Sequence, residues 1–176
     1  MDTKTGCSGW SYSQWAEPFY PAGTKPSDYL KIYSKIFDLV EIDSSFYRVL
    51  DVKMVESLKD STPDNFVFTA KMPQSVTHDL RLKNADREAA AFLERISILK
   101  EKLAFILIQL PPSLSYKDGF PRLKTLLEDL PSEFNYAVEF RHDSWFRGDT
   151  FFLLRERNYP GLVRNSLCQH SCCLDL

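Results

Sequence analysis

The sequence predicts an α/β fold with a parallel sheet, formed by one domain over residues 1–158. An apolar strand segment followed by a helical segment occurs five times in order, and such alternation is typical of parallel strands joined by helical crossovers. One segment, Ala104–Leu110, is almost wholly apolar, as expected of a strand covered on both faces. No glycine-rich dinucleotide fingerprint or P-loop follows any strand, which weighs against a nucleotide-binding domain.

Each predicted strand shows either alternating or continuous apolar side chains, and each predicted helix repeats apolar side chains every three or four residues. The strands are expected at Lys4–Trp10, Leu39–Ser44, Phe66–Lys71, Ala104–Leu110 and Tyr136–Arg141. The helices are expected at residues 27–37, 51–61, 84–100, 120–130 and 149–158, the second of them capped by Asp51. Loops join these elements, including an aromatic-rich loop over residues 11–23 and a loop over residues 72–83.

Composition and charge narrow the possible classes of function. Hydrophobic residues make up 44% and charged residues 26% of the 176 residues, and the formal net charge is −2. So small a charge gives no general attraction to nucleic acid or anionic membranes, and a site of either kind would be a local patch. No apolar run reaches the roughly 18 residues of a membrane span, and residues 1–6 lack a signal-peptide core. We therefore expect a cytoplasmic protein without membrane contacts.

Several stretches resemble the motifs of the YecE-like family, grouped as domain of unknown function family 72 (DUF72). In the order of the family they are Gly6–Tyr12 with Trp15, Phe19–Pro21, Val40–Arg48, Phe68–Lys71, Thr77–His78, Gln109–Pro112 and Glu139–Trp145. The resemblance covers roughly residues 4–158. It implies a TIM-barrel-like fold and no established biochemical activity.

The predicted repeat stops early for a closed barrel of this kind. Five βα units occupy about 155 residues, whereas a closed barrel takes about 250. Residues 159–176 show no strand–helix pattern, and their Cys168, His170, Cys172 and Cys173 have no recognised zinc spacing. We therefore expect a truncated barrel with an irregular tail, in which the first and fifth strands are open edges.

Acidic side chains mark the carboxyl ends of the predicted strands, where α/β folds place their sites. Glu41, Asp43 and Glu139 are the candidate catalytic residues, because crowded carboxylates raise the pKa of one another and can then exchange protons near neutral pH. The alternative is a structural network of ion pairs. Together with His78 and His142, these carboxylates could also hold a divalent metal, although no metal-binding spacing such as HxH or HExxH occurs.

Candidate substrate-binding residues follow the same strand ends and the loops next to them. They are Trp10, Tyr12, Tyr47, Arg48, Lys71, His78, Gln109, Arg141, His142 and Trp145. Cations suit phosphate, and aromatic side chains suit a sugar or a base. The aromatic side chains could instead pack the barrel mouth, which is the role we expect for Phe19 and Phe46.

The best interpretation is an enzyme that binds a small phosphate- or sugar-containing ligand and uses acid/base or metal-assisted chemistry. One alternative is a nucleic-acid-binding protein, in which Arg48, Lys71, Arg81, Lys83 and Arg87 contact phosphates and aromatic side chains contact bases. Another alternative is a truncated product without catalytic activity. The sequence indicates neither the reaction nor the oligomeric state.

Overall fold

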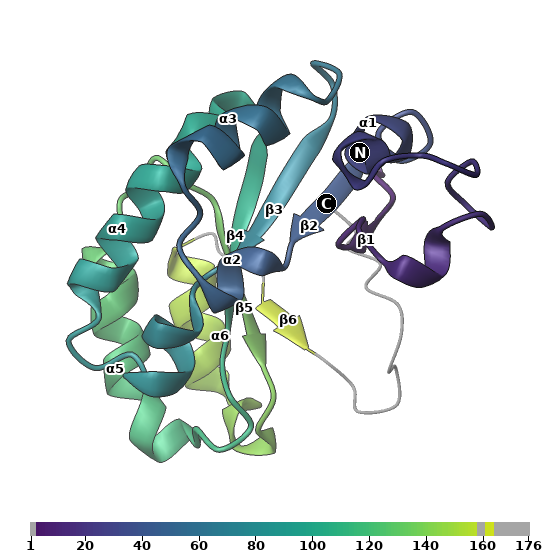
Figure 1. The fold of residues 1–176 in the computed structure, drawn as a ribbon. Helices are drawn as coiled ribbons and strands as arrows, with labels where there is room; N and C mark the ends of the chain where they lie inside the picture. The colour runs from purple at the N-terminus through teal and green to yellow at the C-terminus, as the bar shows by residue number, and fades with distance from the viewer. Residues whose placement is uncertain (1–2, 158–160, 164–176) are drawn as a thin grey trace.

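The structure is a computed structural model, and it describes residues 3–157 and 161–163. Its six-stranded parallel sheet pairs each strand with the next one in the chain (Figure 1). The strands are β1 (Gly6–Ser8), β2 (Leu39–Ile42), β3 (Val67–Lys71), β4 (Leu103–Gln109), β5 (Tyr136–Phe140) and β6 (Gly161–Val163). This order is that of a (β/α) barrel, since a doubly wound sheet would reverse its order at a switch point. The predicted TIM-barrel-like α/β fold is therefore confirmed.

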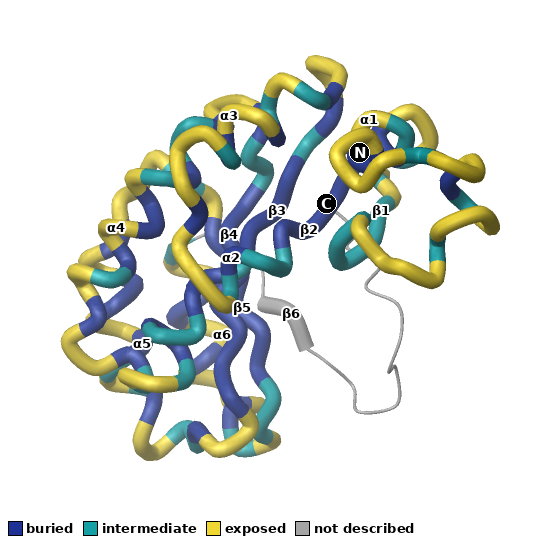
Figure 2. The backbone as a smooth tube through the Cα atoms, in the orientation of Figure 1, coloured by how far each residue is buried: buried dark blue, intermediate teal, exposed yellow. Residues whose placement is uncertain are grey.

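The long helices lie along the outer side of this sheet (Figure 1). The α-helices are α1 (Tyr29–Tyr33), α2 (Ser44–Tyr47), α3 (Val52–Asp60), α4 (Asp86–Ile96), α5 (Tyr116–Asp129) and α6 (Gly148–Glu156). Strand side chains such as Val40, Ile106 and Val138 are fully buried in the main core. Strands β2 to β5 form the buried layer and the outward faces of the helices are exposed (Figure 2). Each large aliphatic side chain buried here contributes about 1.5–3 kcal/mol.

Helices α3 and α4 form where the local sequence predicts them. In α4, Ala89, Phe92, Leu93 and Ile96 are buried at three- and four-residue spacing. In α3, the side chain of Asp51 accepts a hydrogen bond from the backbone N–H of Met54 at 2.9 Å, as expected of a cap. Within the described residues, no helix is long and apolar enough to cross a membrane.

The strand β6 was not predicted, and it changes the edges of the sheet. Val138 pairs with Gly161 and Phe140 pairs with Val163 in a parallel register. The expected irregular tail is therefore wrong for residues 161–163, and among the described strands β1 and β6, rather than β1 and β5, lie at the two ends of the strand order. A three-residue strand has too short a pattern to recognise, because it depends on pairing with β5. The cysteine cluster of residues 168–173 lies outside the described residues.

Two segments that were expected to be loops contain helical turns. The short helix α2 follows β2 directly, and a π-helical turn, Ser75–Asp79, follows β3. The Ser45 hydroxyl donates to the backbone carbonyls of Ile42 at 2.6 Å and Lys71 at 2.8 Å, which ties α2 to the ends of both strands. These turns are held by contacts between strands, so their own sequences give little indication of them.

Helix α5 begins four residues before the expected start. The expected start at residue 120 came from the apolar repeat of Leu123, Leu126, Leu127 and Leu130. In the structure Pro121 lies inside the helix. The preceding turn is stabilised from outside, because the Ser144 hydroxyl accepts from the backbone N–H of Tyr116 at 2.8 Å.

Candidate functional site

A polar pocket, here called the cup, opens at the carboxyl ends of β2 to β5. Its volume is about 390 Å³. It is lined by Asp43, Phe46, Tyr47, Lys71, Gln74, His78, Gln109 and Arg141. The structure thus brings together six of the thirteen predicted site residues, from four different strand ends.

Lys71 lies at the centre of the acidic side of the cup. Its Nζ is 2.6 Å from Oδ1 of Asp43 and 3.3 Å from Oε1 of Glu41. Burial disfavours the charge of Lys71, but the two carboxylates outweigh this effect and raise the pKa of the lysine above its ordinary value. Lys71 therefore stays charged at neutral pH.

Glu41 lies behind the lining of the cup and is nearly inaccessible to solvent. Its Oε1 accepts a hydrogen bond of 2.6 Å from the hydroxyl of Ser8, in addition to its contact with Lys71. Asp43 differs, because 38% of its side chain is exposed and it lines the cup directly. Of these two carboxylates, Asp43 is the one that a ligand can reach.

Glu139 is buried in a similar way on the other side of the cup. Its Oε1 accepts from Nε of Arg141 at 2.8 Å, and its Oε2 accepts from Nε2 of Gln109 at 2.7 Å. Both carboxylate oxygens are therefore occupied, so Glu139 orients Arg141 and Gln109. Within the described part of the chain, the terminal guanidinium nitrogens of Arg141 have no hydrogen-bond partner.

His78 reaches the cup from the π-helical turn after β3. Its Nδ1 lies 2.8 Å from the hydroxyl of Thr77, and its ring packs edge-on against Phe46 at 5.0 Å. Burial and the positive charge of Arg141 lower the pKa of His78, against a smaller opposing effect of Asp79. The imidazole is thus neutral at pH 7, and Nε2 is the ring nitrogen left for a ligand.

The backbone around His78 adopts conformations that side chains disfavour. Arg81, Leu82 and Asn84 have φ values of 51°, 64° and 51°, in the left-handed region. Arg81 holds this segment in place, because its guanidinium donates to the hydroxyl and the carbonyl of Ser113, each at 3.0 Å. π-Helical turns and strained backbone occur often at functional sites, which makes this segment a supporting indication.

The aromatic candidates fall into different environments. Tyr47 lines the cup and is 73% exposed. Tyr12 lies beside the cup, where its hydroxyl donates to the carbonyl of Ser8, and its pKa is raised by burial and then by Asp43. Trp10 is partly buried and packs against the main core instead of lining the cup.

Two residues of the last motif have structural roles in place of the predicted ligand contacts. Trp145 is completely buried, stacks on Phe140 and donates its indole N–H to the carbonyl of Leu114 at 2.8 Å. Nδ1 of His142 accepts from the backbone N–H of Ser144 at 3.1 Å and caps a short turn. Neither lines the cup, because the chain turns away from it directly after Arg141.

The cationic residues proposed for phosphate or nucleic-acid contacts do not gather at one place. Lys71 lines the cup, whereas Arg81 is engaged with Ser113 and Arg48 contacts the sulfur of Met54 at 4.0 Å. Lys83 and Arg87 are exposed and lie outside the lining of the cup.

The geometry gives no metal site from the predicted ligands. Among the described residues, no three His, Cys, Asp or Glu side chains converge as a metal ion would require. In the cup, Lys71 occupies the space between the carboxylates of Glu41 and Asp43.

Two residues that line the cup and one that supports it are not among the predicted site residues. Gln74 and Phe46 line the cup, and Ser8 supports Glu41 from β1. Phe46 was expected only to pack. The position of Phe46 directly before the candidate Tyr47 could have indicated that Phe46 lines the same pocket. Gln74 gave no such indication, because it precedes a π-helical turn that is not evident from the sequence.

Comparisons with known proteins find a family match, related sequences and related folds. The family model described as "Protein of unknown function DUF72" matches residues 4–164. The UPF0759 protein YecE of Escherichia coli K12 is 30% identical over 141 residues, which cover 80% of this chain and 49% of YecE. The UPF0759 protein YunF of Bacillus subtilis is 30% identical over 151 residues, covering 80% of this chain and 51% of YunF. The chain thus spans about half the length of these relatives.

Two solved structures of DUF72 family proteins are similar to this chain. A crystal structure of a DUF72 family protein from Thermotoga maritima has a TM-score of 0.79 and 33% sequence identity to this chain. The match covers 90% of this chain and 63% of the Thermotoga chain. A crystal structure of a DUF72 family protein from Enterococcus faecalis has a TM-score of 0.73 at 20% sequence identity. The match covers 90% of this chain and 59% of the Enterococcus chain, and it shows a shared fold only. Together with the match over residues 4–164, these similarities show that the chain belongs to the DUF72 family.

Proposed function

We propose that the cup binds a small ligand with one anionic group, such as a sugar phosphate, and that the chain forms part of an enzyme. The observation that carries this proposal is the arrangement of Arg141. Its Nε is fixed by Glu139, while its terminal nitrogens are without partners in the described chain and the residue lines the cup. A guanidinium held in this way is preorganised for the paired oxygens of a phosphate or carboxylate.

The size and charge of the cup define the class of ligand. A volume of about 390 Å³ lies at the small end of ligand sites, which run from about 300 to 1,000 Å³. The three carboxylates of Glu41, Asp43 and Glu139 exceed the two cationic groups of Lys71 and Arg141 by one charge. Affinity would therefore come from directed hydrogen bonds and not from an overall positive charge.

Two cup residues are suited to exchanging protons with the ligand. Asp43 is partly exposed, and His78 is neutral at pH 7 with Nε2 left for a ligand. General acid/base catalysis requires such groups within reach of the substrate. In this proposal Glu41 and Glu139 are positioning residues that hold Lys71 and Arg141, which changes the roles expected from their sequence.

The nucleic-acid alternative receives less support from the arrangement of the side chains. A nucleic-acid site needs several cations along one surface to contact successive phosphates. The cations expected for this role instead lie apart, with Arg81 bound to Ser113 and Arg48 next to Met54. We therefore propose that the cup binds a small anionic ligand, in preference to a nucleic-acid site.

Calorimetric titration of this chain with ribose 5-phosphate tests the proposal. We expect Arg141→Lys to weaken binding about tenfold or more, because lysine cannot form the paired hydrogen bonds and a tenfold change corresponds to about 1.4 kcal/mol. Arg87→Lys is the matched control, since Arg87 is exposed on α4 outside the cup. Equal binding of ribose without phosphate, or unchanged binding by Arg141→Lys, would contradict an anionic ligand held by Arg141.

A further inference from the structure

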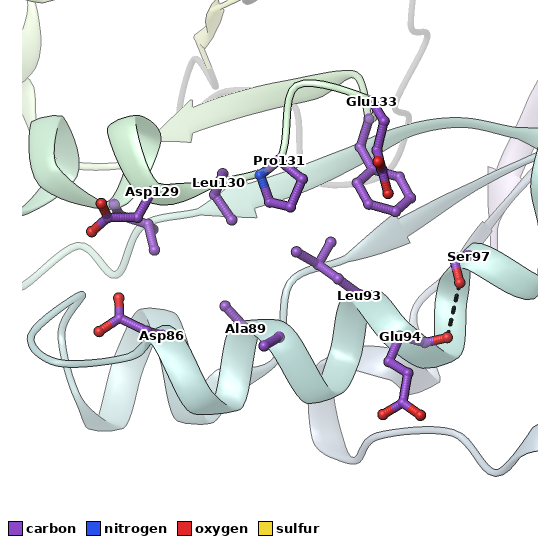
Figure 3. Close-up of a pocket in the computed structure, with 12 residues that line it drawn as sticks. Asp86, Ala89, Leu93, Glu94, Ser97, Asp129, Leu130, Pro131 and Glu133 are labelled. Atoms are coloured by element: carbon purple, nitrogen blue, oxygen red, sulfur yellow. Dashed lines mark hydrogen bonds between the residues drawn. The ribbon is translucent and has the colours of Figure 1, made fainter.

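A second pocket lies on the helical side of the sheet and shares no residue with the cup. This groove runs between α4 on one side and the end of α5 with the following loop on the other (Figure 3). Its volume is about 380 Å³. It extends along α4 from Asp86 to Ser97, a length of about 17 Å at 1.5 Å per residue.

The floor of the groove is apolar. Leu93 points across it toward Leu130 and Pro131 (Figure 3). Leu126 and Phe134 add to the same surface. Ala90 also lines the groove and is exposed. Because its side chain is small, a bound molecule could approach the surface of α4 closely at this position.

The rim of the groove is acidic. Asp86 and Asp129 lie on facing sides at one end, and Glu133 lies near the other end (Figure 3). All three are exposed, and none has an ion pair or side-chain hydrogen bond with another residue in the described chain. Glu94 also borders the groove, with Arg95 at 3.5 Å. The groove therefore has an apolar floor, and in the described chain the carboxylates of Asp86, Asp129 and Glu133 on its rim have no cationic partner.

We propose that this groove binds a short basic segment of a partner protein. Apolar side chains of the segment would cover the floor, and a Lys or Arg would reach Asp86 and Asp129. Apolar burial would supply most of the affinity, while the acidic rim would select basic sequences and exclude acidic ones. An elongated, open groove suits a peptide segment better than a small cation, which would contact only one end.

Selection from a phage-displayed library of random 12-residue peptides tests this proposal, using the whole chain as bait. We expect the enriched peptides to combine apolar residues with Lys or Arg. Synthetic versions of them should bind at least tenfold more weakly to Ala90→Lys, which places a long cationic side chain in the groove. Ala91→Lys is the matched control, because Ala91 is exposed on the same helix but does not line the groove.

A double substitution of the rim separates charge from shape. Asp86→Asn with Asp129→Asn should weaken the basic peptides at least tenfold and leave the melting curve of the protein nearly unchanged. The proposal is overturned if no peptide is enriched, if enriched peptides lack a net positive charge, or if they bind Ala90→Lys as tightly as the unsubstituted chain. Both Lys variants are checked by circular dichroism, so that loss of folding is distinguished from loss of binding.

Discussion

The acidic side chains of Asp43 and Glu139, both at strand ends, differ in what their oxygen atoms contact. Both oxygens of Glu139 accept hydrogen bonds, from Arg141 and Gln109. In Asp43, Oδ1 forms an ion pair with Nζ of Lys71, and the side chain remains partly exposed. A strand pattern places such carboxylates at the same end of the sheet but does not say which of them is enclosed. In the proposed function, solvent exposure and hydrogen bonds therefore favour Asp43 over Glu139 as the residue that exchanges protons with the ligand.

His78 gives a prediction about pH at the same scale. Burial and Arg141 hold the pKa of His78 below its ordinary value of 6.5, so the unfolded chain binds this proton more readily than the folded one. Stability from this residue is thus present above pH 6.5 and is lost as the pH falls through the folded pKa. In urea unfolding between pH 7 and pH 5, we expect His78→Gln to lose stability less steeply than the unsubstituted chain. Identical slopes would contradict the lowered pKa.

At the scale of elements, the close contact between α5 and Trp145 depends on one glycine. A Cβ on Gly119 would lie 2.6 Å from the Trp145 ring and 2.9 Å from Leu114. Both neighbours are fully buried, so neither has space to move away. This packing places Trp145 in the core, against the part of α5 that precedes its expected start.

We therefore expect Gly119→Ala to destabilise the fold by about 1–3 kcal/mol, despite the better helix propensity of alanine. Gly148→Ala is a matched control on helix α6, where a Cβ would meet nothing within 4 Å. It should be neutral or stabilising by up to about 1 kcal/mol. Urea unfolding of both variants measures the difference. Equal stabilities would show that the α5–Trp145 contact adapts without cost.

Elements were predictable where their signal is local. Helix α4 shows its buried face in its own sequence, and Asp51 caps α3 as expected. Strand β6 and the π-helical turn depend on pairing with β5 or on contacts with neighbouring loops, so their own residues do not indicate them. For the same reason the sequence does not show that Trp145 is buried, because its burial depends on contacts with Gly119 and Leu114.

For the whole molecule, the cup joins residues that are far apart in the sequence. Asp43, Lys71 and Arg141 come from the ends of β2, β3 and β5, and the parallel order of the sheet places all three at its carboxyl end. From the sequence, the parallel sheet was predictable by its βα alternation and the barrel order of its strands by the resemblance to the DUF72 family, so that the place of the candidate cup was also predictable. The cup's ion pairs and its lining residue Gln74 were not, because they depend on side-chain geometry.

The central claim is that Arg141 anchors an anionic group in the cup. A crystal structure of this chain with saturating ribose 5-phosphate tests it most directly. We predict that the phosphate lies within hydrogen-bond distance of the terminal nitrogens of Arg141, with the sugar close to Asp43 and His78. An empty cup under these conditions, or a phosphate bound elsewhere on the molecule, would contradict the proposed function.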